Sequence, residues 1–174
     1  MGFLSFRLST EKDIPFYESL FKDSDWILDS GFRQEDFHTK AQLLNFISKH
    51  KKEDVKGIVY DLNNNHDIGF CHFKYLENGK YEICGGIRKE LLDKGYGIHS
   101  FVFCINYLFQ NYDCSELHSV VYEFNNRSRK MDVKTGFVES GFLFYDTRKF
   151  FVYVLTPSAF YNCSFVNLIL NRNK

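Results

Sequence analysis

Two glycines and a lysine stand where a strand would give way to a helix, in the segment Leu92–Ile98 (LDKGYGI). Gly95 and Gly97 allow a tight turn in which successive N–H groups point into one concavity. The helix that follows would direct its positive dipole end at this concavity, and Lys94 would add a movable charge. These residues predict a phosphate or pyrophosphate site on the backbone of residues 93–98. The alternative is a plain strand-to-helix connection without a ligand.

Regular elements on both sides would hold this turn in place. Glu82–Ile87 has the composition of a strand interrupted at Gly85-Gly86, where a bulge or a close backbone approach is expected. A second strand is expected at Leu117–Phe124. Because a strand–helix–strand crossover places its strands parallel and right-handed, these two strands should be parallel. The helix between them has one apolar stripe of period 3.6, made of Ile98, Phe101, Val102, Ile105, Leu108 and Phe109.

The rest of the chain supplies further strands and two N-terminal helices. Helices are expected after Thr10 or Asp13 and again after Thr39, and Asn78-Gly79 is a hairpin signal. The segment 158–174 is apolar with a basic end, and it is either a packed last turn or a dimer contact. Further strands are predicted at Phe3–Leu8, Val55–Leu62, Asp67–Leu76, Val138–Tyr145 and Phe150–Leu155. We therefore expect one domain over residues 1–174 with a mixed sheet.

Charge and cysteine usage restrict the function classes. Acidic and basic residues balance at 22 each, which gives no basic footprint for nucleic acid. The five cysteines are an odd number without a CxxC pair, so reduced core thiols are expected rather than a disulfide framework or a metal site. Reduced thiols favour a cytoplasmic protein, and no segment has the pattern of a signal peptide or a membrane span.

The motifs together resemble those of the GNAT acyltransferase superfamily. The segment DKGYG follows a strand, and after the next strand comes NNRSRKMDVKTGF, from Asn125 to Phe137. This pattern is similar to the branch that holds ribosomal-protein N-terminal acetyltransferases and many small-amine acetyltransferases. The resemblance covers the chain from Phe3 to about Phe160. It implies an α/β (α+β) fold, in which a mostly antiparallel sheet of about seven strands is flanked by helices and has a splayed parallel pair at its centre.

The resemblance also implies acetyl-CoA as co-substrate. Its pantetheine arm would lie between the two splayed strands and bond to the backbone around Ile87 and Arg88. Its pyrophosphate would lie on the turn formed by Asp93, Lys94, Gly95, Tyr96, Gly97 and Ile98. The family usually has Arg or Gln at the first position of this motif, whereas this chain has Leu92.

Acyl transfer to an amine requires a base, because a free alkylamine has a pKa of about 10. Glu82, beside the splay, is the expected base, directly or through a water, and His72 and Glu123 are alternatives. The backbone N–H of about Ile87 would stabilise the oxyanion. Asp23, Asp25, Trp26 and Asp29 of the segment 22–36 would line the acceptor side together with the last hairpin, and His72 is a further substrate candidate. The alternative for the acidic residues is a solvated loop.

The departing thiolate requires a proton donor. Many relatives carry a tyrosine four residues after the serine of the NxxS motif, but this chain has Asp132 there. In the branch that this chain resembles, the hydroxyl of Ser128 would donate the proton and Asn125 would hold the pantetheine arm, although Ser128 could instead be only a helix cap. Tyr145 and Tyr122 are further hydroxyls within reach.

Three functions remain open from the sequence. The first is acetyl-CoA-dependent N-acetylation of a primary amine on a small molecule, such as an amino sugar, a sugar nucleotide, a polyamine or an antibiotic. The second is acetylation of a protein N-terminus, for which the neutral net charge provides no obvious docking surface. The third is a catalytically silent CoA-binding module, which the departures at Leu92 and Asp132 allow. A homodimer is possible in each case.

Overall fold

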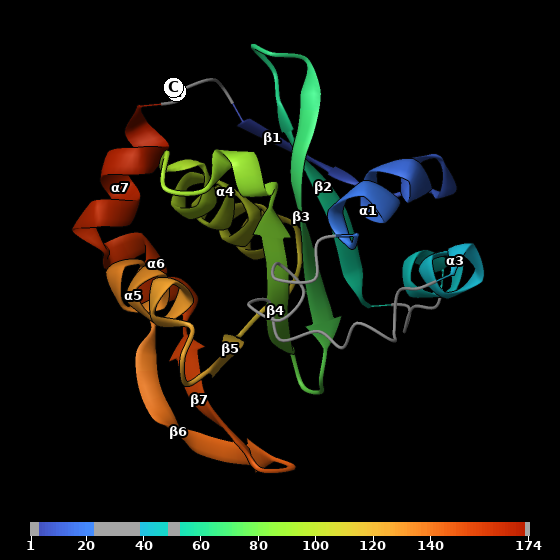
Figure 1. The fold of residues 1–174 in the computed structure, drawn as a ribbon. Helices are drawn as coiled ribbons and strands as arrows, with labels where there is room; N and C mark the ends of the chain where they lie inside the picture. The colour runs from blue at the N-terminus through green and yellow to red at the C-terminus, as the bar shows by residue number, and fades with distance from the viewer. Residues whose placement is uncertain (1–3, 23–38, 49–52, 173–174) are drawn as a thin grey trace.

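The computed structural model describes residues 4–22, 39–48 and 53–172 and has one seven-stranded sheet at its centre (Figure 1). The strand order is β1-β2-β3-β4-β5-β7-β6, and β4 and β5 form its parallel pair. This confirms the mixed, mostly antiparallel sheet that the sequence predicts. The strands are β1 (Leu4–Leu8), β2 (Val55–Asp61), β3 (His66–Tyr75), β4 (Lys80–Ile87), β5 (Glu116–Tyr122), β6 (Val138–Tyr145) and β7 (Arg148–Leu155).

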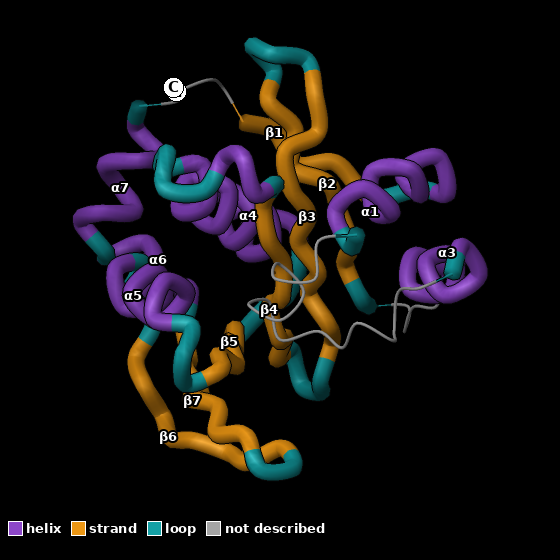
Figure 2. Tube along the Cα trace, in the orientation of Figure 1, coloured by secondary structure: helices purple, strands orange, loops and turns teal. Residues whose placement is uncertain are grey.

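Helices cover both faces of the sheet, as the tube in Figure 2 shows. On one face lie α4 and α7, whose buried residues join a core with the sheet; on the other face lie α1 and α3, which pack a second core around Tyr17 and Phe70. The helices are α1 (Ile14–Leu20), α3 (Lys40–Ser48), α4 (Tyr96–Asn111), α5 (Asn126–Lys134), α6 (Pro157–Asn162) and α7 (Ser164–Asn171), with short 3₁₀ turns at Glu11–Asp13 and Lys89–Leu91.

Local signals in the sequence account for several of these boundaries. Asn78 and Gly79 have φ values of 49° and 74°, as the tight turn between β3 and β4 requires. Thr10 and Asp13 form a reciprocal capping box around the 3₁₀ turn that leads into α1. The apolar stripe of α4 buries Val102, Ile105 and Leu108, so the predicted helix and its inward face are confirmed.

The C-terminal segment is helical and packed. Phe160 of α6 and Val166 and Ile169 of α7 are buried in the core that contains α4. The apolar residues of this tail therefore stabilise the chain's own fold, which corresponds to the packed alternative predicted from the sequence. Among the described residues, no helix is long and apolar enough to cross a membrane.

The strands β4 and β5 pair over only part of their length, and this positions the candidate site. Their register runs from Lys80 opposite Glu116 to Ile83 opposite Ser119 and then ends (Figure 1). The other side of β4 remains paired with β3 as far as Ile87 opposite Gly69. The predicted interruption of β4 at Gly85-Gly86 is therefore wrong.

Gly85 is needed for a different reason, because a Cβ there would lie 2.5 Å from the Phe70 carbonyl oxygen of β3. The glycine thus reflects the close backbone approach that the sequence analysis gave as the other reading. The two strands part because β5 leaves β4, while β4 itself continues.

Candidate active site

A cavity of about 430 Å³ begins where β4 and β5 part. On the β4 side it is lined by Cys84, Gly85 and Gly86, and it extends to the first two turns of α4 at Gly97 and Ser100. Its opposite wall comes from the end of β5 and from α5, and includes Ser119, Tyr122, Asn125, Arg127, Ser128, Met131 and Asp132. One cavity thus joins the strand gap to the helix N-terminus.

The turn before α4 has the backbone conformation that the sequence predicts. Asp93 and Gly95 have φ values of 59° and 84°, and α4 begins at Tyr96. The first N–H groups of a helix have no partner within the helix, so the amides of Tyr96, Gly97 and Ile98 are available to an anion. Gly97 lines the cavity and Lys94 is an exposed residue of the turn. Leu92, which replaces the usual Arg or Gln, also lines the cavity.

Ser100 provides an independent sign that a polar ligand belongs here. It lines the cavity from α4, its exposed fraction is 4%, and its Oγ atom has no hydrogen-bond partner among the described residues. A buried hydroxyl without a partner costs about 1–3 kcal/mol. A ligand with polar groups would remove that cost, so the cavity fits a molecule with amide or phosphate groups such as CoA.

The backbone of β4 alternates in direction, and this decides which groups can reach a ligand in the gap. Arg88 donates its N–H to the Ile68 carbonyl oxygen of β3 at 2.8 Å. The odd-numbered residues of β4 therefore direct their N–H and C=O groups the other way, toward β5. Gly85 is one of them and lies beyond the last β4–β5 pair. Ile87 is another odd-numbered residue of β4, so its backbone also points toward the gap.

The prediction that Arg88 offers its backbone to the co-substrate is therefore wrong. Its N–H is bonded to Ile68, and its carbonyl oxygen accepts the N–H of Leu91. Its side chain is engaged as well, because Nε donates to the Asp67 carbonyl oxygen at 2.9 Å and the guanidinium lies 4.9 Å from the Phe16 ring centroid. Arg88 ties the end of β4 to β3 and α1.

The start of α5 supplies the next group of predicted residues. Asn125 is the N-cap residue, and its Oδ1 accepts the backbone N–H of Ser128 at 3.1 Å. Ser128 is therefore not the helix cap, and its hydroxyl remains a candidate on the cavity wall. Arg127 also lines the cavity, and its exposed ion pair with Asp93, at 3.1 Å, links α5 to the glycine turn.

Asp132 and Ser119 form a buried pair that the sequence analysis did not connect. The Ser119 hydroxyl donates to Asp132 Oδ2 at 2.8 Å, and both residues line the cavity where β4 and β5 part. Asp132 is 1% exposed. Burial raises the pKa of Asp132 to about 7, although the bond from Ser119 acts in the opposite direction. The departure from the tyrosine pattern was visible in the sequence, but its buried partner was not.

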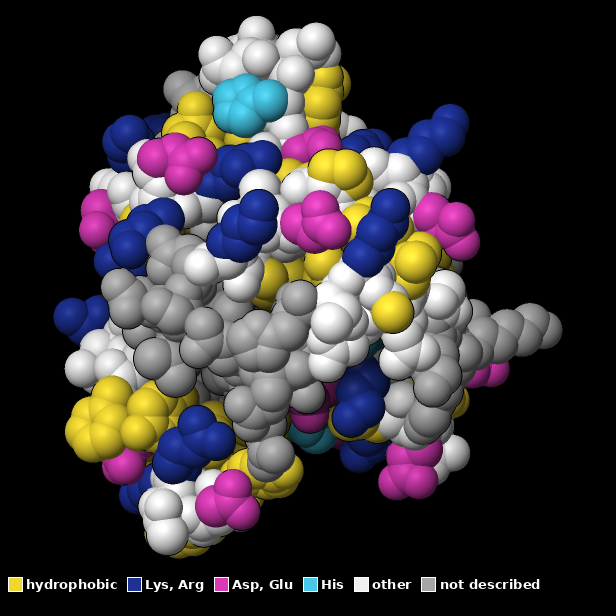
Figure 3. All heavy atoms as spheres, turned by 45° about the vertical axis from the view of Figure 1, so that its right-hand side comes forward, with side chains coloured by type: hydrophobic (Ala, Val, Ile, Leu, Met, Phe, Trp, Pro, Cys, Tyr) yellow, Lys and Arg dark blue, Asp and Glu magenta, His cyan; other side chains and the backbone are white. Residues whose placement is uncertain are grey.

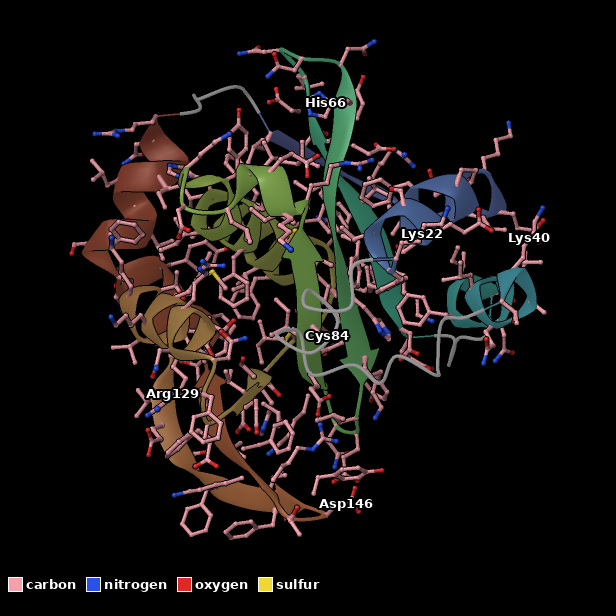
Figure 4. The ribbon with its side chains drawn as sticks, viewed as in Figure 1. Lys22, Lys40, His66, Cys84, Arg129 and Asp146 are labelled. Carbon is pink, nitrogen blue, oxygen red and sulfur yellow. The ribbon has the colours of Figure 1, made fainter. Side chains whose placement is uncertain are left out.

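A second polar group lies on the face of the sheet that α1 and α3 cover. Cys84, which lines the cavity, has its Sγ atom 3.8 Å from Nδ1 of His72, and His72 Nε2 lies 3.8 Å from Asp54 Oδ2. Burial, and then the nearby Glu82, raise the pKa of the Cys84 thiol to about 12, so it remains protonated. Figure 4 shows Cys84 at the middle of the sheet, beside the strand gap.

Glu82 and His72 are thus grouped with Cys84, and neither lines the cavity directly. Glu82 lies two residues before Cys84 on β4, and His72 is opposite Cys84 on β3. A water or an acceptor amine would have to connect Glu82 to the cavity. The alternative base Glu123 follows β5, and its backbone pairs with Lys149.

The two tyrosines that the sequence offers as further hydroxyls lie in different places. Tyr145 ends β6 at the tip of the β6–β7 hairpin, next to Asp146, which Figure 4 shows far below Cys84. Tyr122, the other hydroxyl considered, does line the cavity. Asp23, Asp25, Trp26 and Asp29 lie outside the described residues.

Comparison with known proteins begins with the protein-family models. The model described as "Acetyltransferase (GNAT) domain" matches residues 4–138, which is most of the chain. A search of curated proteins found no significant match.

Solved structures share the fold at low sequence identity. A spermidine N-acetyltransferase from Vibrio cholerae, crystallised with CoA and spermine, has a TM-score of 0.81 and 18% identity over 92% of this chain and 99% of that chain. The aminoglycoside acetyltransferase AAC(6')-Ib, in complex with coenzyme A and kanamycin, has a TM-score of 0.77 and 17% identity over 91% and 97%. An uncharacterised protein from Bacillus halodurans has a TM-score of 0.79 and 15% identity over 97% and 91%.

Proposed function

The chain belongs to the GNAT acetyltransferase family, whose enzymes use acetyl-CoA as the acetyl donor, and from this premise we propose that it acetylates a primary amine of a small molecule. One observation carries the proposal. A single cavity joins the gap between β4 and β5 to the amides at the start of α4, and the buried hydroxyl of Ser100, which has no partner among the described residues, lines this cavity. An elongated ligand with an amide-containing arm and a diphosphate matches this arrangement.

In this proposal the backbone holds the co-substrate. The amides of residues 93–98 bind the diphosphate, and the positive end of the α4 dipole adds to the attraction. Gly85 and Ile87 direct backbone groups at the pantetheine arm, while Ser100 and Asn125 bond to it from the walls. Because these contacts come mainly from backbone groups, Leu92 can replace a charged side chain without removing the site.

The side chains carry the proton transfers. Bound acetyl-CoA supplies an acetyl thioester at the apex of the strand gap. Glu82 accepts the proton of the acceptor ammonium, directly or through a water, and His72 is the alternative base. The N–H of Ile87 stabilises the charge that develops on the acetyl oxygen. The Ser128 hydroxyl lies on the wall opposite β4 and hydrogen-bonds the sulfur, and Tyr122, which also lines the cavity, is the other hydroxyl candidate.

A small amine is the favoured acceptor for two reasons. The net charge of the chain is zero, so its overall charge does not favour a basic ribosomal protein as acceptor. The structural neighbours were crystallised with spermine and with kanamycin, which are both small molecules that carry amino groups, and we propose an acceptor of this kind here. Acceptor contacts from Asp25, Trp26 and His72 belong to this proposal.

The experiment measures thiol release from acetyl-CoA with polyamines, amino sugars, aminoglycosides and a peptide with a free N-terminus. We expect turnover with at least one small amine and none with the peptide. Turnover with the peptide alone would replace the proposal by N-terminal acetylation. CoA binding without turnover on any acceptor would support a silent CoA-binding module.

A pair of variants tests the anion site separately. A Cβ at Gly97 would lie 3.7 Å from Ile87 Cδ1, which is an ordinary contact, so both Gly97→Asp and Gly97→Asn should fold. Asp would place a negative charge beside the diphosphate, and we expect CoA to bind roughly tenfold more weakly to Gly97→Asp than to Gly97→Asn. Calorimetry with CoA measures the difference, and equal affinities would exclude the diphosphate from this turn.

The assembly, the domain boundaries and the location complete the proposal. We take residues 1–174 to act as one domain of a cytoplasmic enzyme.

A homodimer would use the sheet edge at β6, where Val138, Phe142, Leu143 and Phe144 are exposed. In Figure 3, hydrophobic side chains gather in the lower part of the molecule, at the same level as this hairpin in Figure 1. Light scattering tests the dimer, and a monomer at high concentration would exclude it.

A further inference from the structure

We infer that Asp132, held by Ser119, is the acid that protonates the departing thiolate in the reaction proposed above. The inference rests on that proposed function and adds to it the source of the proton. Ser128 can hydrogen-bond a sulfur atom, but a serine hydroxyl has no proton to give up near neutral pH. A carboxyl group does, provided that it is protonated before the reaction and lies at the reacting end of the cavity.

The position of the pair satisfies the geometric condition. Ser119 is the last residue of β5 in register with β4, so its side chain marks the apex of the strand gap. Its hydroxyl donates to Asp132 Oδ2 at 2.8 Å, and both residues line the cavity. Because Oδ2 accepts this bond, the proton of a neutral Asp132 lies on Oδ1. The β4 residue next to the last pair is Cys84, on the other wall of the same cavity.

Burial satisfies the second condition. Asp132 is 1% exposed, and the loss of water around it raises its pKa to about 7, so a large fraction of the molecules carry the proton at neutral pH. The charged groups on neighbouring elements are engaged elsewhere. Arg129 of α5 lies 3.9 Å from the Phe151 ring centroid, and His118 of β5 lies 3.2 Å from Glu116.

Two cationic residues, Arg127 and Lys89, also line the cavity, and Arg127 pairs with Asp93 at 3.1 Å. Lys134 of α5 lies over the Phe165 ring at 4.1 Å, and the pKa of Asp132 is set by burial and by the bond from Ser119. The thiol of Cys84, with a pKa of about 12, lies beside His72 on the face of the sheet that α1 and α3 cover. A carboxylate at this place has one hydrogen bond, from Ser119. The neutral form of Asp132 is therefore the one that the fold stabilises.

The proton transfer balances without a further reactant. As the amine nitrogen forms its bond to the acetyl carbon, the C–S bond breaks and its electron pair stays on sulfur. Asp132 gives its proton from Oδ1 to that sulfur and becomes a carboxylate. The nitrogen has given one proton to Glu82 before the attack and loses a second one to solvent water as the amide forms. The carboxylate of Asp132 then regains a proton from solvent, so each turnover releases one proton overall. A thiol has a pKa of about 8.5, so proton transfer to the thiolate from an acid near 7 is favourable.

The first test compares the native chain with Asp132→Asn, Ser119→Ala and the control Asp113→Asn, which changes an exposed aspartate outside the cavity. We expect Asp132→Asn to lower kcat by about 10²- to 10⁴-fold with KM for acetyl-CoA little changed. The native kcat should fall above about pH 7. Ser119→Ala removes the bond that lowers this pKa, so its alkaline limb should shift to higher pH.

The second test does not depend on turnover. Infrared spectroscopy should show a protonated-carboxyl band near pH 6 that is present in the native chain and in Asp113→Asn but absent in Asp132→Asn. CoA should shift this band, whereas desulfo-CoA, which lacks the sulfur atom, should not. An unshifted band, or an Asp132→Asn variant with native kcat, overturns the inference.

Failure of the inference about Asp132 can be told apart from failure of the proposed function. If the native chain turns over an amine and Asp132→Asn does so equally well, only the role of Asp132 is lost. If no amine is acetylated, the proposed function is lost, and the infrared comparison of CoA with desulfo-CoA still decides whether Asp132 lies at the sulfur.

Discussion

Two regions of this molecule bury an aspartate, and the two carboxyl groups behave in opposite ways. Asp61 ends β2 and is 0% exposed, and Asp132 lies on α5 and is 1% exposed. Burial acts to raise the pKa of both. At Asp61 hydrogen bonds outweigh burial and its pKa is lowered, whereas at Asp132 burial prevails and its pKa is raised to about 7.

The number of donors explains the contrast. Asp61 accepts bonds from the backbone N–H groups of Asn63 and Asn64, from the Asn64 side chain and from the Tyr96 hydroxyl. Asp132 accepts one side-chain bond, from Ser119. Donors stabilise a carboxylate and their scarcity favours the neutral acid. Burial alone thus does not decide whether an aspartate is structural or chemical; the groups that face it do.

Both regions serve the same site in different ways. Tyr96 is the first residue of α4, so its bond to Asp61 at 3.3 Å fixes the start of the helix that presents the glycine turn. Asp132 lies at the other end of the cavity, where the two strands part. In the reaction proposed above, Asp61 helps to place the co-substrate and Asp132 is the proton donor.

The largest expected effect is on the pH dependence of stability. The folded pKa of Asp132 lies above its unfolded value of 3.8, so the folded state binds more protons and loses stability as pH rises from about 4 to about 7. Asp132→Asn removes this loss. Its free energy of unfolding should match the native value near pH 4 and exceed it by at most roughly 4 kcal/mol above pH 7.

Urea unfolding from pH 4 to pH 8 measures this difference, with Asp113→Asn as the control that should follow the native curve. Parallel curves for the native chain and Asp132→Asn would show that Asp132 is ionised in the folded state, and the contrast with Asp61 would disappear.

The next effect comes from Asp61→Asn. An amide at this position would turn an NH₂ group toward donors that need an acceptor, and we expect a loss of about 2–3 kcal/mol in the free energy of unfolding at pH 7. The folded pKa of Asp61 is lowered, so its stabilising contribution should disappear as pH falls through that pKa. The deficit should therefore shrink at low pH.

Urea unfolding at pH 7 and at pH 3 measures both parts of this prediction. A deficit that is equal at the two pH values would mean that the charge of Asp61 does not matter. If the variant Asp61→Asn had native stability at pH 7, the prediction would be contradicted altogether.

The smallest effect is expected from Tyr96→Phe, which removes one donor of Asp61 and leaves the ring in place. We expect a loss of about 1 kcal/mol in stability and a small rise in KM for acetyl-CoA, because the start of α4 is held less firmly. Steady-state kinetics and urea unfolding measure these values. A loss as large as that of Asp61→Asn would show that the tyrosine, and not the set of four donors, keeps Asp61 charged.

Much of the architecture was predictable because it depends on local patterns. The Asn78-Gly79 turn, the inward stripe of α4 and the parallel strands around it follow from backbone preferences and periodicity. The glycine turn before α4 was predictable for the same reason, since Gly95 requires a positive φ of 84°. The family model matches residues 4–138, a range that contains these elements.

Other parts of the site depend on contacts that no local pattern encodes. The sequence predicts backbone contacts at Arg88, but packing against Ile68 and Phe16 uses both its backbone and its side chain. Gly85 is required by the carbonyl of Phe70, fifteen positions earlier in the chain, and not by a break in its own strand. Tyr145 follows the Asn125–Phe137 motif by only eight positions in the sequence, yet β6 carries it to the tip of the β6–β7 hairpin.

The sequence by itself determined the antiparallel meander of β2, β3 and β4, the parallel placement of β4 and β5, the backbone turn before α4 and the family, because each follows from neighbouring residues and the steric limits of the backbone. Only the tertiary structure decided the charge of the two buried aspartates. A carboxyl pKa depends on the water that packing removes and on the donors that packing supplies, and for Asp132 the single donor is Ser119, 13 positions away on another element.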